Sequence, residues 1–238
     1  MIEVKNLTKS YLHNGKRKFV FKNLNFSIKD GESVCVLGGN GVGKSTLLRI
    51  LGGIDFADSG YINKNCSISW PFGVASGFQA GLTASENVKF VSKIFGTHSK
   101  KGIEEKIEIV RDFADIGDYF DRPYKTYSSG MKGRLSFGLS LAFKFDVYLL
   151  DEVLARGDIG FREKCKKAVK ELKKVSSFII VTHNYDFLKN NNIEKGYILH
   201  DQKMMEYNDV YQALKDCNKL LTKSNDYGSD FFQENLEE

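Results

Sequence analysis

The feature that most constrains the fold is a short glycine-rich loop near the start of the chain. It consists of a glycine, four further residues and then Gly-Lys-Ser, and it reads Gly38-Gly39-Asn40-Gly41-Val42-Gly43-Lys44-Ser45. Glycines let the backbone curl so that its N–H groups point inward, where they can hold phosphate oxygens. The apolar run 33–37 predicts a buried strand before the loop, and the spacing from Thr46 onward predicts a helix after it. A helix N-terminus favours the same anion, so the segment predicts a phosphate-binding site.

The residue types in this loop predict ATP as the ligand and Mg²⁺ as the accompanying ion. The backbone from Gly38 to Thr46 would bind the nucleotide. Lys44 is predicted to reach its β- and γ-phosphates and to act in catalysis, and the Ser45 hydroxyl is predicted to bind Mg²⁺.

A site of this kind also needs a carboxylate on a neighbouring strand. Residues 147–150 form an apolar run that ends in Asp151-Glu152. We expect Asp151 to bind Mg²⁺, and Glu152 to act as the general base that polarises the attacking water. The two motifs together predict an enzyme that hydrolyses ATP.

Strands alternate with helices along the chain, which predicts an α/β protein with a mixed β core. The N-terminal part is rich in strand formers, and Asn14-Gly15 predicts a hairpin turn in an antiparallel β region. Residues 83–145 are predicted to form an inserted helical subdomain that opens with the capping box Thr83-Ala84-Ser85-Glu86. Within it, apolar residues three and four apart predict helices over residues 86–95 and 103–116. Residues 1–218 would form one nucleotide-binding domain, and the acid-rich residues 219–238 a flexible tail.

Composition excludes several classes of protein. The 238 residues are 42% apolar and 27% charged, as in an ordinary globular domain. The net charge of +5 tolerates an anionic partner without requiring one, and we expect no nucleic acid partner. The four cysteines lie far apart in the sequence, which argues against a zinc motif and favours a reducing compartment. No apolar stretch reaches the roughly 18–20 residues that span a bilayer.

Tyr127-Ser128-Ser129-Gly130-Met131 resembles the signature motif of the ATP-binding cassette (ABC) ATPases. It lies at the family's usual distance before Asp151. The resemblance extends over about residues 1–215 and implies the ABC-type P-loop fold. It also implies that Ser128, Ser129 and Gly130 contact nucleotide.

Other landmarks of the ABC family follow in the right order. The resemblance implies that Gln79 and His183 act at the catalytic site, with Gln79 also at the Mg²⁺. It implies that Tyr11 stacks on adenine and that Asp158, in the loop after Glu152, lies at the nucleotide.

The signature departs from the common family pattern, because Ser129 replaces a glycine and Met131 replaces a glutamine. This variant is similar to the signature in the ATPases of polysaccharide exporters. The segments 53–55, 68–71 and 86–90 are similar to those of capsular-polysaccharide exporter ATPases of the KpsT type.

This resemblance implies how the chain works. Two copies would pair head-to-tail as a homodimer, with Ser128 and Gly130 acting on the ATP held by the partner's phosphate loop. The pair would drive a separate integral membrane subunit from the cytoplasmic face of the inner membrane, to which the chain would be bound peripherally. The polysaccharide would not be bound directly by this chain.

Three alternatives remain open at this point. The same machine could export O-antigen or teichoic acid. A soluble ABC ATPase that acts on ribosomes or DNA is a rival from another class, but it would favour tandem cassettes or a long coiled coil. A regulatory module without turnover is disfavoured because Lys44, Asp151, Glu152 and His183 are all present.

Overall fold

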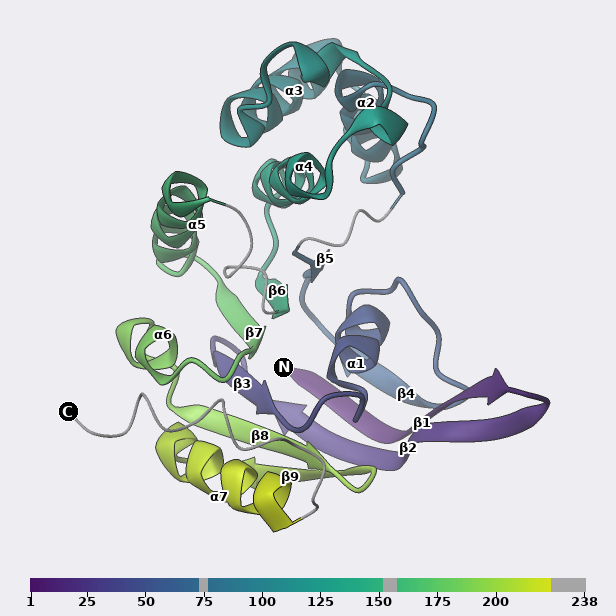
Figure 1. Cartoon of the computed structure of the whole chain (residues 1–238), viewed down its shortest axis with the longest axis vertical. Helices are drawn as coiled ribbons and strands as arrows, with labels where there is room; N and C mark the ends of the chain where they lie inside the picture. The colour runs from purple at the N-terminus through teal and green to yellow at the C-terminus, as the bar shows by residue number, and fades with distance from the viewer. Residues whose placement is uncertain (73–76, 152–157, 224–238) are drawn as a thin grey trace.

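The computed structural model describes residues 1–72, 77–151 and 158–223, in which strands alternate with helices (Figure 1). The strands are β1 (Ile2–His13), β2 (Lys16–Ile28), β3 (Val34–Leu37), β4 (Ser59–Lys64), β5 (Ile68–Pro71), β6 (Val147–Asp151), β7 (Ser177–Val181), β8 (Lys195–His200) and β9 (Lys203–Tyr207). The helices are α1 (Lys44–Leu51), α2 (Ala84–Ile94), α3 (Lys100–Ala114), α4 (Ser129–Leu141), α5 (Ile159–Leu172), α6 (Tyr185–Asn190) and α7 (Val210–Lys223), with short 3-10 helices η1 (Gly117–Asp121) and η2 (Tyr124–Thr126). Within these residues, no helix is both long and apolar enough to cross a membrane.

A six-stranded sheet forms the centre of the molecule, in the order β5-β6-β7-β3-β8-β9. Its first five strands run parallel, and β9 is antiparallel to β8. The central strands β3 and β7 are buried along their whole length, as expected for parallel strands covered on both faces. The predicted mixed β core is therefore confirmed.

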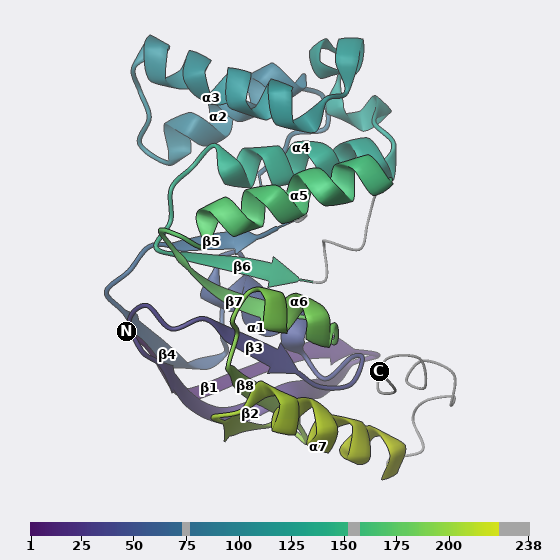
Figure 2. The same cartoon turned by 90° about the vertical axis from the view of Figure 1, so that its left-hand side faces the viewer.

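Alternation along these strands divides the core between two faces. In β3, Val34 and Val36 point into one hydrophobic cluster, while Cys35 and Leu37 point into the other. The first cluster lies between the sheet, α1 and the antiparallel strands β1 and β2. The second lies under the helices on the opposite face, so the sheet separates α1 from the helical layer (Figure 2). Each large aliphatic side chain buried here stabilises the fold by about 1.5–3 kcal/mol.

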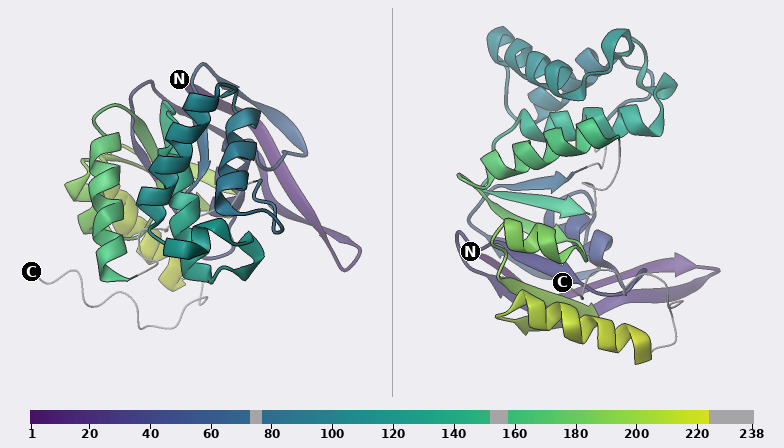
Figure 3. Two further views of the ribbon diagram at one scale, coloured as in Figure 1. Left: turned by 90° about the horizontal axis from the view of Figure 1, so that it is seen from above. Right: turned by 60° about the vertical axis from the view of Figure 1, so that its left-hand side comes forward.

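The N-terminal strands form a separate three-stranded antiparallel sheet in the order β2-β1-β4. Asn14 and Gly15 both have positive φ, at 50° and 72°, as a two-residue hairpin turn requires. His13 pairs with Lys16 across this turn, which confirms the hairpin. The turn end projects beyond the body of the molecule (Figure 3).

The helical layer follows the predicted pattern with shifted ends. Helix α2 begins at the capping box of Thr83 and Glu86, as expected. Helix α3 ends at Ala114 because Asp115 has a left-handed φ of 46°, which stops the helix expected to reach residue 116. Trp70 joins this layer to the sheet: its indole N–H donates to the Ser140 hydroxyl of α4 at 2.8 Å.

Helix α7 crosses the boundary at which the acidic tail was predicted to begin. It continues from Val210 to Lys223, into the range 219–238. Leu220 and Leu221 pack against the core, which explains why the helix extends this far. Residues 224–238 lie outside the described residues.

Candidate functional site

The carboxyl ends of parallel strands β3, β6 and β7 meet at one edge of the sheet. The register places Cys35 opposite Ile180, and Asp151 opposite Val181. At this edge β3 continues into the phosphate loop, β6 ends at Asp151, and β7 leads into Thr182 and His183. In open α/β sheets the loops at this edge form the ligand site.

The phosphate loop passes close to strands β8 and β2, which leave almost no room for a side chain at either end of the loop. A Cβ on Gly38, at φ +145°, would lie 2.4 Å from the Leu199 carbonyl oxygen of β8. A Cβ on Gly43, at φ +108°, would lie 2.2 Å from the Val20 side chain of β2. Glycine is therefore required at both ends of the loop for its conformation and for this close approach.

Lys44 opens helix α1 and directs its ammonium group back into the loop. Its side chain is buried, and its Nζ donates hydrogen bonds to the carbonyl oxygens of Gly38 at 2.6 Å and Gly39 at 2.8 Å. The positive charge is thus held where an anion bound by the loop would meet it.

The other residues of the loop differ in exposure. Asn40, Gly41 and Ser45 are exposed and available to a ligand, whereas Val42 is half-buried. Thr46 is buried in the first turn of α1, where its hydroxyl accepts a hydrogen bond from Arg49 at 3.2 Å.

Asp151 and His183 are positioned by the sheet itself. Asp151 is the last residue of β6 and is half-buried, so its carboxyl group can reach the loop edge. Half-buried His183 follows Thr182, whose carbonyl oxygen accepts a hydrogen bond from the Cys35 thiol at 3.5 Å. This contact ties the segment after β7 to the strand that carries the phosphate loop. Glu152 lies outside the described residues.

Gln79 lies in the segment between β5 and α2, with its side chain exposed. Its backbone is held firmly. The Gln79 N–H donates to the Asn87 side-chain oxygen at 2.7 Å, and its carbonyl oxygen accepts from the Asn87 amide at 3.1 Å. An exposed side chain on a fixed backbone suits a group that meets a ligand only when the ligand is bound.

The signature residues Ser128, Ser129 and Gly130 are exposed at the start of α4. Ser128 is the N-cap of this helix and accepts a hydrogen bond from the Met131 N–H at 3.2 Å. Helix α4 lies in the helical layer, on the other side of strands β5 and β6 from α1 (Figure 2). The fold does not bring this motif to the chain's own phosphate loop.

Asp158 is engaged within the chain in this structure. Its carboxylate caps α5 by accepting from the Phe161 N–H at 2.9 Å, and it also pairs with Arg134 of α4. The hydrogen bond from Phe161, followed by that from Arg134, holds the pKa of Asp158 below its usual range. Its predicted contact with nucleotide stays a prediction.

Tyr11 lies near the end of β1 with its ring partly exposed. Its hydroxyl donates to Asp55 at 2.7 Å, and Lys9 forms an ion pair with the same carboxylate at 2.7 Å. Burial opposes ionisation of Asp55, but these hydrogen bonds outweigh it and lower its pKa. The hydroxyl is thus anchored, and the predicted stacking of the ring on adenine stays a prediction.

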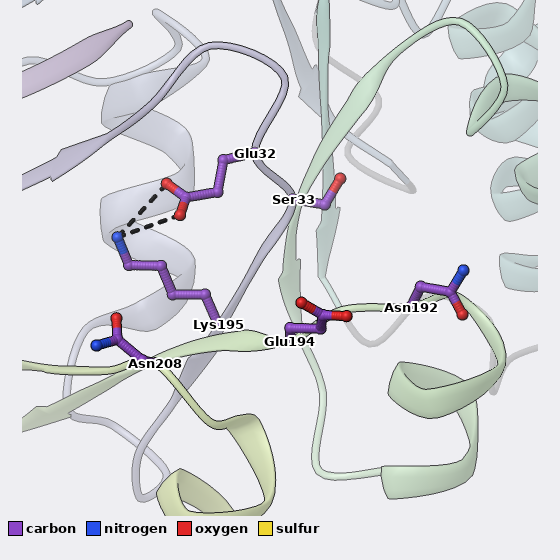
Figure 4. Close-up of a pocket in the computed structure, with 6 residues that line it drawn as sticks. All are labelled: Glu32, Ser33, Asn192, Glu194, Lys195 and Asn208. Atoms are coloured by element: carbon purple, nitrogen blue, oxygen red, sulfur yellow. Dashed lines mark hydrogen bonds and ion pairs between the residues drawn. The ribbon is translucent and has the colours of Figure 1, made fainter.

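A polar pocket of about 290 Å³ lies at the opposite edge of the sheet, where β3 and β8 begin (Figure 4). Lys195 lines this pocket, and its ammonium group pairs with Glu32 at 3.3 Å and with Glu206 at 2.7 Å. These partners raise the pKa of Lys195 despite its burial. These ion pairs join β8 and β9 to the turn that precedes β3, and we assign the pocket no role in nucleotide binding.

Two residues that support the site were not singled out from the sequence. Asn87 and Arg134 hold the segments that carry Gln79 and Asp158. A signal for Asn87 existed, because it occupies the buried face of α2 together with Ala84, Val88 and Val91. A polar residue on such a face needs partners. No comparable pattern pointed to Arg134.

This fold and this edge of the sheet define the class of protein: an ATP-binding P-loop protein of the cassette type. A family model described as ABC transporter matches residues 21–155, and the chain belongs to this family. It is therefore an ABC-type ATPase.

Curated relatives share most of the chain. It is 56% identical to a polysialic acid transport ATP-binding protein KpsT from Escherichia coli, over 79% of this chain and 84% of that protein. A second protein of that name from Escherichia coli is 46% identical over 93% of this chain and 100% of its own length. The capsule polysaccharide export ATP-binding protein CtrD from Neisseria meningitidis serogroup B is 37% identical over 92% of this chain and 100% of its own.

Solved structures confirm the fold. A dimeric ATP-binding cassette, MJ0796, bound to ADP and Pi, aligns with a TM-score of 0.70 at 24% identity, over 87% of this chain and 98% of the other.

Proposed function

We propose that this chain powers the export of a capsular polysaccharide through a separate membrane subunit. One observation carries the enzymatic part of the proposal: the phosphate loop, Asp151 and His183 lie at one edge of the sheet. The polysaccharide is inferred from the relatives, which are named for polysialic acid transport and capsule export. The polysaccharide is handled by the membrane subunit and is not bound by this chain.

Two copies of the chain act together, head-to-tail. The phosphate loop holds the nucleotide, but Ser128 and Gly130 are exposed on another layer of the same chain. A second copy in inverted orientation presents these groups to the γ-phosphate, where the Ser128 hydroxyl and the Gly130 N–H donate hydrogen bonds. The dimeric state of the similar cassette structures supports pairing of two copies.

The donor set at the loop edge fits Mg²⁺. The Ser45 hydroxyl is exposed at the start of α1, and the Asp151 carboxyl group ends β6. Hydroxyl, carboxylate and amide oxygens are the hard ligands that Mg²⁺ takes together with phosphate oxygens. Gln79 would supply the amide oxygen. When bound, the ion would neutralise the charge of the β- and γ-phosphates, while Glu152 accepts a proton from the attacking water.

An exposed apolar face of α2 is the proposed contact with the membrane subunit. Phe90, Ile94 and the following Phe95 are 40%, 62% and 49% exposed. Phe90 and Ile94 lie on the helix whose first turn holds the Gln79 segment, and Phe95 caps its C-terminus. Exposed apolar patches of this kind mark protein contacts. This docking places the chain at the cytoplasmic face of the inner membrane as a peripheral subunit.

Dimerisation tests the head-to-tail arrangement. The Glu152→Gln chain, which lacks the base, is expected to accumulate as an ATP-bound dimer in size-exclusion chromatography with light scattering. Adding Ser128→Arg should abolish the dimer but leave fluorescent ATP binding by the monomer, whereas adding Lys44→Ala should abolish both. A Ser128→Arg chain that still dimerises would refute the action of the signature in trans.

Complementation tests the transport role. The chain is expressed in Escherichia coli that makes polysialic acid but lacks its own KpsT. Surface polysialic acid, measured with a specific antibody, should return with the wild-type chain and not with Lys44→Ala. Restoration of teichoic acid or O-antigen export alone, in matching deletion strains, would reassign the substrate.

A further inference from the structure

The buried side chain of Asn87 makes an unusually complete set of contacts with the segment that carries Gln79. Asn87 is 0% exposed, in the first turns of α2. Its oxygen accepts from the Gln79 N–H at 2.7 Å. Its amide nitrogen donates to the carbonyl oxygens of Gln79 at 3.1 Å, Leu82 at 3.2 Å and Thr83 at 2.9 Å. One carboxamide thus contacts both backbone groups of Gln79, and its two N–H groups are shared among three carbonyl oxygens of the segment.

These contacts fix the position of Gln79 without touching its side chain. A buried polar group left unpaired costs about 1–3 kcal/mol, so the segment 79–83 cannot readily leave Asn87 while that side chain stays buried. The exposed Gln79 side chain is thereby held on a backbone that moves only with α2. Asn87 would set the distance from Gln79 to the ligand without contacting the ligand.

The same segment is joined to the residues that precede the signature. The Tyr124 N–H donates to the Leu82 carbonyl oxygen at 2.8 Å, and the Lys125 N–H donates to the Ala80 carbonyl oxygen at 2.9 Å. The rings of Phe78 and Tyr124 lie 5.1 Å apart. A displacement of Gln79 would therefore be passed through this pairing toward Ser128, three residues after Lys125.

We propose that Asn87 is a positioning residue for ATP hydrolysis. It fixes the Gln79 backbone, and it couples that segment to residues 123–125, at η2, which lead into the signature. The inference rests on the proposed action of Gln79 at the nucleotide. Asn87 acts on turnover, whereas binding of nucleotide to the phosphate loop does not depend on it.

Two variants and a matched control test this role. Asn87→Ala removes all four contacts. In Asn87→Ser the hydroxyl can donate to the Thr83 carbonyl oxygen, just as the Ser92 hydroxyl donates to the Val88 carbonyl oxygen at 2.7 Å. The buried polar side chain then still has a hydrogen-bond partner within the helix, but its contacts with Gln79 are lost. Ser92→Ala is the control, because Ser92 is equally buried on α2 and its hydroxyl donates within the helix, to the Val88 carbonyl oxygen. Steady-state ATPase activity and affinity for a fluorescent ATP analogue are measured on each full-length chain, with and without Gln79→Ala.

Both Asn87 variants are expected to lower kcat at least tenfold and to leave nucleotide affinity within about twofold, because misplacing a catalytic group by about 1 Å can cost 10²-fold in rate. Ser92→Ala should keep kcat within about threefold of wild type. In the Gln79→Ala background, Asn87→Ser should change kcat by less than twofold, because its effect passes through Gln79.

The role of Asn87 would be overturned if Asn87→Ser kept the wild-type kcat. It would also be overturned if the fold-losses in kcat of Asn87→Ser and Gln79→Ala multiplied in the double variant. Either result would leave the proposed action of Gln79 intact. Wild-type kcat in Gln79→Ala alone would instead overturn the proposed action of Gln79, and the inference with it.

Discussion

Replacing Gly43 with alanine tests the close approach between the phosphate loop and strand β2. At φ +108°, an alanine would adopt a backbone conformation that costs about 1–3 kcal/mol. Its Cβ would also lie 2.2 Å from Val20 Cγ1, so either the loop or the hairpin must shift. Strain of this kind in a packed region adds about 1 kcal/mol or more. We expect Gly43→Ala to lower the free energy of unfolding by about 2–4 kcal/mol.

Gly41 is the matched control in the same loop. It also has a positive φ, at 75°, but no other atom lies within 4 Å of the position of a Cβ. Gly41→Ala should therefore cost only about 1–2 kcal/mol, the price of a left-handed conformation. Urea denaturation of each chain without nucleotide measures both values, and a fluorescent ATP analogue shows whether the loop still binds.

A second-site change separates the steric part of the effect from the backbone part. Val20→Ala shortens the side chain that the new Cβ would meet, so it should destabilise the Gly43→Ala chain less than the wild-type chain. Equal losses for Gly41→Ala and Gly43→Ala, with no coupling to Val20, would refute the reasoning that β2 restricts the loop.

Three further predictions concern the residues that support the site. Trp70→Phe removes the indole donor to Ser140 and should lower the free energy of unfolding by about 1–2 kcal/mol in urea denaturation; an unchanged value would contradict the role of this hydrogen bond. The lowered pKa of Asp158 means that its stabilising contacts are present above its unfolded pKa of about 3.9 and are lost as the pH falls through its folded pKa. The melting temperature of the wild-type chain should therefore fall more steeply below about pH 4 than that of Arg134→Ala, and parallel curves would argue against the pair. Burial raises the pKa of the Cys35 thiol to about 12, so mass spectrometry should find it unmodified by iodoacetamide at pH 8 in the folded chain and modified in urea.

Much of the fold could be predicted because local patterns and tertiary packing agree. The hairpin turn at Asn14-Gly15 and the capping box at Thr83 follow from short-range chemistry, and both formed as expected. The end of α3 at Ala114 comes two residues before the predicted end at residue 116, because a left-handed residue such as Asp115 leaves little trace in hydrophobic spacing.

The candidate site divides in the same way. The residue types of the site could be predicted from the sequence. A phosphate loop and a carboxylate after an apolar strand require particular side chains at particular spacings. Their placement at one edge follows from the parallel order of β6, β7 and β3, which joins residues far apart in the chain. Hydrophobic runs predict that strands exist, but they do not state which strands pair.

The sequence by itself determined the phosphate-loop motif from Gly38 to Thr46, which predicts nucleotide binding there, and the resemblance to an exporter ATPase. Only the tertiary structure decided that Lys44 turns back onto its own loop, that Asp158 is shared between α5 and Arg134, and that Asn87 holds Gln79. These contacts join residues through hydrogen bonds whose geometry depends on how the layers pack. Residue identity gives the capacity for such bonds, and the packed fold selects the partner.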